Sequence, residues 1–351
     1  MTRRRSASSD PAAAPPHGGA TINDIARLAG VSKKTVSRVI NRSPLVRSDT
    51  REKVEGLMRQ HGYAPDPMAR GLAFRKSFLI GMVYDNPNAQ YIVHLQNGAL
   101  DSLRDSGFEL VVHPCDSKNP NYIEGVRKFA VKQRLYGLIL PSRVSEDQAL
   151  IDVLREIDCR YVRIAAVELD DATRMITTND RGGSVEVAKY VESLGHRHVG
   201  LISGPLHYLS ARERSSGFLD TLAERGIHVA AHYVLEGGYT FESGVACAER
   251  LLALTPRPTL IFALNDEMAA GVYKAAYRLG LRIPDQLSVI GFDDSPLASR
   301  VWPSLTTVRL PIREMGLRAA AMLLHPPASG AAALNFSPHL VERESCQSPR
   351  S

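Results

Sequence analysis

The sequence of 351 residues has few cysteines, no long apolar run and none of the short motifs that mark common enzymes. Its cysteines lie far apart and form no C-x-x-C pair, which argues against a zinc site or a disulfide framework and fits a reducing compartment. No apolar stretch approaches the roughly 18 residues of a membrane span. We therefore expect no metal, no disulfide and no membrane segment. The four cysteines are Cys115, Cys159, Cys247 and Cys346.

The catalytic motifs of common nucleotide-binding enzymes and hydrolases are also missing. The chain has no G-x-x-x-x-G-K-[ST], G-x-G-x-x-G, G-x-S-x-G or H-E-x-x-H pattern. Asp293 and Asp294 follow an apolar run, but no third carboxylate or lysine accompanies them as a metal or phosphorylation site would require. The sequence predicts no catalytic residue and no cofactor.

Positive charge is concentrated near the N-terminus. Residues 1–76 contain 15 Lys and Arg against 6 Asp and Glu, a net charge of +9, so the rest of the chain carries −3 of the total +6. The arginines at positions 3 to 5 lack the apolar segment that follows them in an export signal, and residues 1–20 are predicted to be a disordered tail. The charge distribution favours a polyanion-binding end, and the cysteine pattern together with the missing export pattern favours a cytoplasmic protein.

Three short amphipathic helices are predicted within residues 21–62. The first begins at Thr21, where Asp24 completes a capping-box pattern, and ends before Gly30. Ser32 can cap the second helix, and Gly62 ends the third. Their size and spacing match a helix-turn-helix module. The residues predicted to face its core are Ile22, Ile25, Ala26, Ala29, Val36, Val39, Ile40, Val54, Leu57 and Met58.

The second of these helices carries Lys33, Lys34 and Arg38 opposite its apolar stripe. In a helix-turn-helix the second helix enters the major groove, where an arginine can bind guanine O6 and N7 with two hydrogen bonds. From these residues alone, a DNA-reading surface and an ordinary solvated helix face are equally good interpretations.

A further helix start is signalled at Asp66 and Pro67. This helix can run only to about Phe74, which is shorter than the ~12–15 residues that an isolated helix needs in water. We expect residues 67–77 to be a hinge that becomes helical only with a partner.

From Phe78 onward, apolar runs alternate with amphipathic helical stretches. This alternation predicts a parallel, doubly wound α/β architecture, and its length suits two subdomains that face a cleft. In such sheets ligands bind beyond the carboxyl ends of the strands. The apolar runs are FLIGMVY, FELVVH, GLILP, HVGLIS, TLIFAL and LSVIGF.

Several ordered segments decide between the interpretations. TINDIARLAGVSKKTVSRVIN followed by TREKVEGLMRQHGYAPDPMARGLA resembles the DNA-binding domain and hinge of the lactose/galactose repressor (LacI/GalR) family of bacterial transcriptional regulators. SLGHRHVGLISGP, SARERSSGF and PTLIFALNDEMAAGVYKAAYRLGLRIPDQLSVIGFDD resemble the effector-binding core of that family, in the same order. The resemblance extends from residue 21 to about residue 345.

The resemblance implies a fold class and a function. A small all-α helix-turn-helix domain would precede an α/β core of two doubly wound parallel-sheet subdomains, similar to periplasmic binding proteins. The protein would be a homodimeric repressor that binds a near-palindromic DNA operator and responds to a sugar or sugar derivative. A solute-binding protein of the sugar-transport type is the alternative, because its core looks alike. The implied divisions are a tail at 1–20, a DNA-binding domain at 21–66, a hinge at 67–77, an effector-binding and dimerisation core at 78–345, and a tail at 346–351.

The resemblance also implies DNA contacts. Lys33, Lys34 and Arg38 occupy the base-reading positions of the family, and a double lysine departs from the aromatic or amide residue found in many members. Leu72 matches the hinge leucine that wedges into the minor groove. The positions that hold the phosphate backbone fall on Thr21, Ser32, Thr35, Ser37, Asn41 and Tyr63.

The effector site implied by the resemblance lies in the cleft of the core. Arg214 matches the arginine that clamps the effector, and its planar fork suits paired hydroxyls or a carboxylate. Surface solvation, helix capping and core packing are the structural alternatives for the individual residues. The implied effector-binding residues are Asn86, Asn88, Tyr91, Arg214, Tyr239, Asn265 and Asp293.

Overall fold

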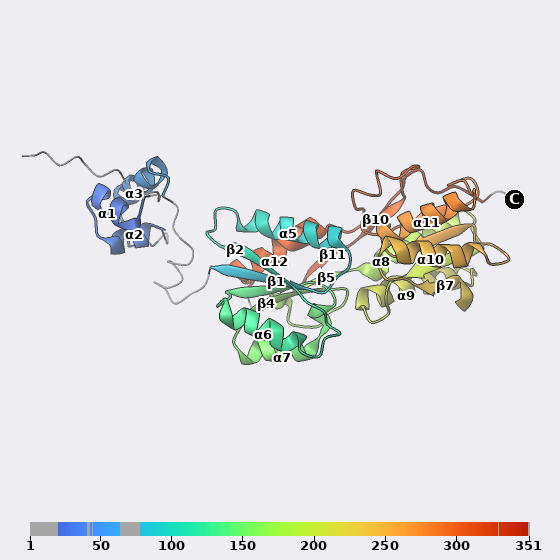
Figure 1. Ribbon diagram of the computed structural model, residues 1–351, viewed down its shortest axis with the longest axis horizontal. Helices are drawn as coiled ribbons and strands as arrows, with labels where there is room; N and C mark the ends of the chain where they lie inside the picture. The colour runs from blue at the N-terminus through green and yellow to red at the C-terminus, as the bar shows by residue number, and fades with distance from the viewer. Residues whose placement is uncertain (1–19, 41–42, 44, 64–77, 329, 350–351) are drawn as a thin grey trace, which may run out of the picture. The chain divides into compact units, whose positions relative to one another are not determined.

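The computed structural model describes residues 20–40, 43, 45–63, 78–328 and 330–349. The chain divides into two compact units, Met1–Phe74 and Arg75–Ser351, which we describe separately as the N-terminal module and the core (Figure 1). Asn41, Leu72 and nearly all of the predicted hinge and N-terminal tail lie outside the described residues.

The N-terminal module contains α1 (Ile22–Ala29), α2 (Lys33–Ile40) and α3 (Ser48–Gln60). The predicted capping box is present, because the Thr21 side chain accepts from the Asp24 backbone N–H while the Asp24 carboxylate accepts from that of Thr21. Gly30 adopts φ +67°, the left-handed conformation that ends α1 at little steric cost. The buried residues of this small core are Ile25, Ala26, Ala29, Val36, Val39 and Val54.

The first half of the core, lobe 1, is built on a six-stranded sheet with the order β11-β5-β4-β3-β1-β2. Every neighbouring pair in this sheet is parallel. Helices α5 and α12 pack together on one face, and α6 and α7 lie on the other (Figure 1). The elements are β1 (Leu79–Tyr84), α5 (Ala89–Leu103), β2 (Glu109–Pro114), α6 (Tyr122–Lys132), β3 (Gly137–Leu140), α7 (Gln148–Glu156), β4 (Arg160–Ala165), β5 (Met175–Thr178), α12 (Ile312–Leu324) and β11 (Leu334–Phe336).

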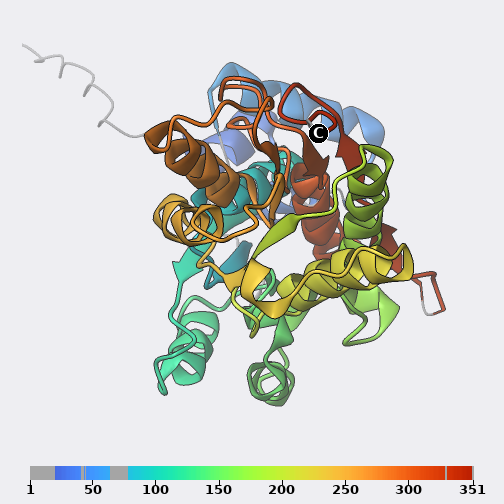
Figure 2. The ribbon, with the colours of Figure 1, turned by 90° about the vertical axis from the view of Figure 1, so that its right-hand side faces the viewer.

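The second half, lobe 2, contains a four-stranded parallel sheet with the order β7-β6-β8-β9. Helix α8 packs on α9, and α10 packs on α11. Figure 2 turns this lobe toward the viewer, with its helices in yellow-green to orange. The elements are α8 (Asp180–Ser193), β6 (Val199–Ser203), α9 (Leu209–Glu224), β7 (Val234–Glu236), α10 (Phe241–Leu252), β8 (Leu260–Ala263), α11 (Asp266–Arg278) and β9 (Ser288–Ile290).

In the described part of the core, the chain passes between the lobes at three places: after β5, before α12 and after β11. Near these crossings β10 (Thr307–Arg309) pairs antiparallel with β12 (His339–Val341), a pairing that the apolar pattern did not predict. The parallel, two-lobed α/β architecture predicted from the alternation is confirmed. None of the described helices is long and apolar enough to cross a membrane.

Candidate nucleic-acid interface and ligand cleft

One face of α2 is basic and exposed. Lys33, Lys34 and Arg38 are exposed, whereas Val36 and Val39 are buried against the other two helices of the module. Lys34 and Arg38 are four positions apart, so their side chains leave the helix in the same direction. This face therefore presents cationic donors along the second helix: Lys33 and Lys34 lie at its amino end, where a helix-turn-helix meets base edges, and Arg38 lies one turn further on.

The predicted phosphate-binding hydroxyls also stabilise helix starts. Thr21 Oγ1 donates to Asp24 Oδ2 at 2.7 Å, and the Ser32 and Thr35 hydroxyl oxygens lie 2.9 Å apart at the start of α2. Thr35 N donates to Ser32 Oγ at 3.1 Å, as expected for an N-cap. Such caps fix the backbone N–H groups of the first turn, which bind anions at helix N-termini. Ser37 and Tyr63 are half-buried, and Tyr63 packs against the core of the module.

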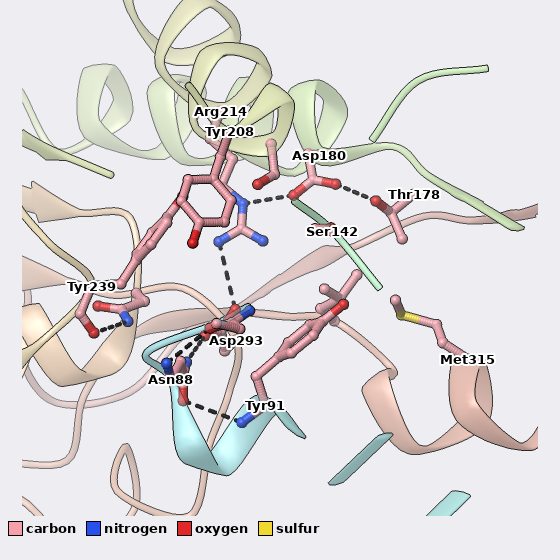
Figure 3. Close-up of a pocket in the computed structure, with 14 residues that line it drawn as sticks. Asn88, Tyr91, Ser142, Thr178, Asp180, Tyr208, Arg214, Tyr239, Asp293 and Met315 are labelled. Atoms are coloured by element: carbon pink, nitrogen blue, oxygen red, sulfur yellow. Dashed lines mark hydrogen bonds and ion pairs between the residues drawn. The ribbon is translucent and has the colours of Figure 1, made fainter. Parts of the chain in front are cut away.

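The structure brings all seven predicted effector-binding residues to one pocket between the lobes (Figure 3). Asn86, Asn88 and Tyr91 come from lobe 1, and the other four come from lobe 2. The pocket residues that sequence analysis did not identify are Ser142, Thr178, Asp180, Tyr208, Ser210, Leu310 and Met315.

A buried arginine occupies the centre of this pocket. Arg214 Nε donates to Asp180 Oδ1 at 2.6 Å, and its Nη1 lies 3.5 Å from Asp293 Oδ1 (Figure 3). Nη1 also donates to the carbonyl oxygen of Leu264 at 2.8 Å, and the guanidinium carbon lies 3.7 Å from the ring centre of Phe292. These contacts fix the plane of the guanidinium, so less conformational freedom remains to be lost when a ligand binds.

The burial of Asp293 changes its acidity. Desolvation raises the pKa of its carboxyl to about 7, although the Arg214 guanidinium lowers it, and the Asp180 carboxylate adds to the rise. Desolvation and the nearby Asp293 charge raise the pKa of Asp266, at the start of α11, to about 8. The lining of the cleft thus combines the Arg214 guanidinium with the Asp293 carboxyl group, whose ionisation burial makes costly.

Three hydrogen bonds hold the two lobes together beside the pocket. Asn88 Nδ2 donates to Asp293 Oδ2 at 3.0 Å, and Tyr208 Oη donates to the carbonyl oxygen of Asp85 at 3.2 Å. Leu209 N, at the start of α9, donates to Glu146 Oε2 at 3.1 Å. The cavity volume is about 30 Å³, which is space for about two water molecules. The lobes are therefore closed on each other in this structure.

Two of the predicted ligand-binding amides also cap helices, the structural alternative considered for Asn265. Asn265 Oδ1 accepts from Met268 N at 2.9 Å, and its Nδ2 donates to the carbonyl oxygen of Tyr239 at 2.9 Å. Asn88 Oδ1 accepts from Tyr91 N at 3.1 Å. An asparagine can therefore cap a helix and line the pocket at once, because the capping hydrogen bond fixes its side chain at the N-terminus of the helix, beside the pocket.

Asp180 is the most important pocket residue that sequence analysis missed. It is the first residue of α8, two positions after the end of β5, and its carboxylate accepts from the Thr178 hydroxyl as well as from Arg214. The rule that points to residues beyond strand ends would have found it, but β5 has only four residues, two of them threonine, and was not recognised as a strand.

No group of three or more His, Cys, Asp or Glu side chains in the described residues is placed to bind a metal ion. The pocket instead provides hydrogen-bond donors, acceptors and tyrosine rings. Tyr208 and Tyr239 meet edge to face, with ring centres 5.6 Å apart. Such a lining is suited to binding a polar organic molecule.

Comparisons with known proteins agree with this architecture. Residues 21–66 match the family model "Bacterial regulatory proteins, lacI family", and residues 188–346 match a "Periplasmic binding protein-like domain". The chain is 34% identical over 310 residues to a probable HTH-type transcriptional repressor ExuR of Bacillus subtilis, with 87% of this chain and 90% of that protein covered. It is 32% identical over 334 residues to the ribose operon repressor of Escherichia coli K12, covering 93% and 99%.

Solved structures show the same arrangement. A lac repressor dimer bound to operator and the anti-inducer ONPF superposes with a TM-score of 0.77 and 27% identity, covering 94% of this chain and all of that chain. A complex of the transcriptional regulator CelR with cellobiose gives a TM-score of 0.69 and 26% identity, covering 93% and 99%.

A helix-turn-helix module followed by a two-lobed core with a polar cleft defines a ligand-responsive DNA-binding regulator. The chain belongs to the LacI family of bacterial transcriptional regulators. Its relatives are repressors and match along the N-terminal module as well as the core, so the solute-binding alternative is wrong. The family consists of DNA-binding regulators, which confirms the prediction that the protein is not an enzyme.

Proposed function

We propose that this regulator is a homodimeric repressor that binds a near-palindromic operator through α2, and that a sugar or sugar derivative in the cleft changes its operator affinity. The observation that carries the effector part is Arg214, which is buried between Asp180 and Asp293 where the two lobes meet. An effector there would contact both lobes at once. Its binding energy would therefore depend on the angle between them.

The chemistry of the pocket favours a ligand with neighbouring hydroxyl groups. The Nη2 atom of Arg214 takes no part in the contacts described above and can donate to such a pair, while the carboxylates of Asp180 and Asp293 can accept hydrogen bonds from the same hydroxyls. Tyr208 and Tyr239 supply ring surface for the apolar face of a sugar. The names of two relatives, a ribose operon repressor and a regulator in complex with cellobiose, support this ligand class.

The proposed DNA contacts are the exposed cations of α2 and the capped starts of α1 and α2. Lys33, Lys34 and Arg38 would reach base edges, and the phosphate contacts would include Thr21, Ser32, Thr35, Ser37 and Tyr63. The sequence adds Asn41 and Leu72, which lie outside the described residues. A dimer places two such faces on two half-sites, which is why we propose a near-palindromic operator. Because it acts on operator DNA, we place the protein in the cytoplasm.

The proposed dimer is supported by exposed apolar side chains on lobe 2. Trp302 is 86% exposed and Tyr277 is 78% exposed. Tyr273 Oη, one helical turn before Tyr277, donates to the carbonyl oxygen of Pro303 at 2.9 Å, so the end of α11 lies beside the loop that carries Trp302. Large exposed apolar patches mark interaction sites, and the related lac repressor structure is a dimer.

The functional divisions proposed from the sequence are the tails at 1–20 and 346–351, the DNA-binding domain at 21–66, the hinge at 67–77 and the effector core at 78–345. The family match at residues 21–66 and the separation of compact units at Phe74 and Arg75 support the first internal boundary and the hinge position.

The function is tested by fluorescence anisotropy with operator DNA selected from a random pool, with and without a panel of sugars. We expect one sugar to change operator affinity about 5- to 150-fold. Arg214→Lys keeps a cation beside the two carboxylates but loses the planar fork, so this variant should bind operator normally and no longer respond. The matched control is Arg212→Lys, an exposed arginine on the same helix, which should respond like the wild type.

Two results would contradict the proposal. If the wild-type protein selects no sequence from the random pool, it does not bind a specific operator. If the Arg214→Lys variant still responds to the sugar with unchanged sensitivity, the sugar does not bind in the cleft.

A further inference from the structure

Lobe 1 contains a second, larger cavity. It lies at the opposite ends of the strands of the sheet from the effector cleft. The cleft residues follow the carboxyl ends of β1, β3 and β5, whereas this cavity lies at the amino ends of β4 and β5. Its volume is about 460 Å³, within the range of small-molecule sites. We call it the arginine groove. It is lined by Arg155, Asp158, Cys159, Arg160, Tyr161, Val162, Thr173, Arg174, Met322, Leu323, Pro326 and Pro327.

The lining of the arginine groove is positively charged, with three guanidinium groups against the single carboxylate of Asp158. Arg155 is paired with Asp170, with 3.0 Å between Nη2 and Oδ2. Arg160 and Arg174 have no carboxylate within ion-pair distance among the residues that the structure describes. Asp171 acts on Arg174 only at longer range, so the groove offers two guanidinium groups that are not held in a direct ion pair.

Both unpaired arginines are held by tyrosines. Arg160 Nη1 donates to Tyr136 Oη at 2.6 Å, and its guanidinium carbon lies 4.8 Å from the centre of that ring. Arg174 lies over the ring of Tyr161, with 5.4 Å between its guanidinium carbon and the ring centre. These contacts orient the two guanidinium groups and leave other N–H donors of each group for a ligand.

The tyrosine beneath Arg174 is itself fixed. Tyr161 is 3% exposed, its Oη donates to Asp170 Oδ2 at 2.8 Å, and Arg155 Nε donates to Tyr161 Oη at 3.0 Å. Asp170 is held in turn by the fully buried Arg163. The wall of the groove is thus preorganised, which lowers the entropic cost of binding a ligand there.

We propose that the arginine groove binds a small organic phosphate, at a site separate from the effector cleft. A phosphate monoester carries about −1.5 to −2 charges near neutral pH, which matches two unpaired guanidinium groups. Val162, Leu323 and the two prolines provide apolar surface for the organic part of the ligand. The backbone of DNA carries the same phosphate chemistry. A concave site with apolar walls nevertheless favours a small molecule over a duplex.

The test is isothermal titration calorimetry of the full chain with phenyl phosphate at fixed ionic strength. We expect saturable binding that phenol does not show and that inorganic phosphate shows more weakly, because the groove recognises both the charge and the ring. Arg160→Gln and Arg174→Gln should each weaken binding about 10-fold or more. Both side chains are exposed, so neither substitution should change the melting temperature measured by circular dichroism.

The control variant is Arg257→Gln, which removes an exposed arginine of lobe 2 and should leave binding unchanged. The proposal is overturned if the wild type shows no saturable binding, or if Arg257→Gln weakens it as much as the groove variants do. It is also overturned if Arg214→Lys, and neither groove variant, abolishes binding, since phenyl phosphate then occupies the cleft. Loss of operator affinity in the groove variants without phenyl phosphate binding would identify a DNA contact instead. None of these outcomes depends on which sugar binds in the cleft.

Discussion

Asn88 Nδ2 donates to Asp293 Oδ2 at 3.0 Å, although the two residues are 205 positions apart and belong to different lobes. Asn88 simultaneously caps α5, and Asp293 adopts φ +109°, a strained conformation for a residue other than glycine. This hydrogen bond, one of the three described between the lobes, thus lies inside the pocket. A ligand that binds between the lobes would depend on the closed arrangement that this contact stabilises, which links occupancy to the angle between the lobes.

Asn88→Asp isolates this contact. The substitution retains a side-chain oxygen to cap α5, so the helix start should be preserved. It removes the donor to Asp293 and places a second carboxylate against it, which destabilises the closed arrangement. We expect effector affinity to fall about 10-fold or more, because a hydrogen bond to a charged group is worth about 1.5–3 kcal/mol and about 1.4 kcal/mol is tenfold in affinity. Isothermal titration calorimetry with the effector measures this loss of affinity.

The comparison variant is Asn121→Asp at the start of α6, where the side chain makes no capping hydrogen bond. It changes the charge by the same amount outside the pocket and should leave effector affinity unaltered. Equal losses in the two variants would show that net charge, and not the contact between the lobes, controls the affinity.

Stability should depend on pH through Asp266. This residue is fully buried, its Oδ1 accepts from Thr307 Oγ1 at 2.5 Å, and its Oδ2 accepts from Ser295 N at 2.6 Å. Burial raises its pKa from 3.8 to about 8, so the folded state binds more protons than the unfolded state between about pH 4 and pH 8. The stability of the core should therefore fall as pH rises through that window.

Asp266→Asn removes the titration and should flatten this dependence. Differential scanning calorimetry from pH 5 to pH 8, in buffers of equal ionic strength, compares the melting temperatures. Asp220→Asn, an exposed carboxylate on α9, is the control and should keep the wild-type slope. A slope in Asp266→Asn as steep as in the wild type would assign the dependence to other groups, of which Asp293 is the first candidate.

Arg38 should read a base and not merely a phosphate. Its side chain is exposed on α2, so Arg38→Ala should leave the fold intact and cost about 1–3 kcal/mol of operator binding, with relaxed preference at one base pair in each half-site. Binding to selected and scrambled DNA, measured from about 50 to 200 mM salt, separates the two roles.

Lys53→Ala on α3 is the matched loss of one exposed charge in the same module. This substitution should weaken binding to selected and to scrambled DNA by similar, small factors. If Arg38→Ala behaves in the same way, with no change in sequence preference, then Arg38 contacts the backbone and the base-reading assignment is wrong.

Much of this structure could be predicted because its signals are local. The pairing of Thr21 with Asp24 and the left-handed Gly30 define α1 from a few neighbouring residues. The apolar runs marked β1, β2, β3, β6, β8 and β9 correctly. The family resemblance led to Asn86, Asn265 and Asp293, which stand just beyond three of these strands and all line the cleft.

The rest depends on contacts between distant residues. β4 was not recognised because Arg160 and Arg163 interrupt its apolar pattern, and Arg163 can be buried only because Asp170 and the Ser145 carbonyl oxygen bind its guanidinium. The closure of the lobes and the shape of the arginine groove likewise have no sequence signal, since both result from tertiary packing.

Close packing on α12 holds α5 in place, and the start of α5 positions its N-cap Asn88 and Tyr91 in the cleft. The two helices approach so closely at Gly98 that a Cβ atom there would lie 1.8 Å from the carbonyl oxygen of Arg313. Gly316 is packed against α5 in the same way, because a Cβ atom added there would lie 2.1 Å from the Leu95 carbonyl oxygen. Backbone atoms cannot rotate away as a flexible side chain can, so Gly98→Ala must push the helices apart.

We expect Gly98→Ala to destabilise the core by at least about 1–3 kcal/mol, as overpacking does, and to weaken effector binding through the displaced start of α5. Gly125→Ala, within α6, is the matched control because nothing lies within 4 Å of its Cβ position. There the helix propensity of alanine should dominate and stabilise the protein by about 0.5–1 kcal/mol. Urea unfolding gives both values. Opposite signs for the two substitutions support the close packing of α5 on α12, whereas stabilisation by both would show that the helices can separate without cost.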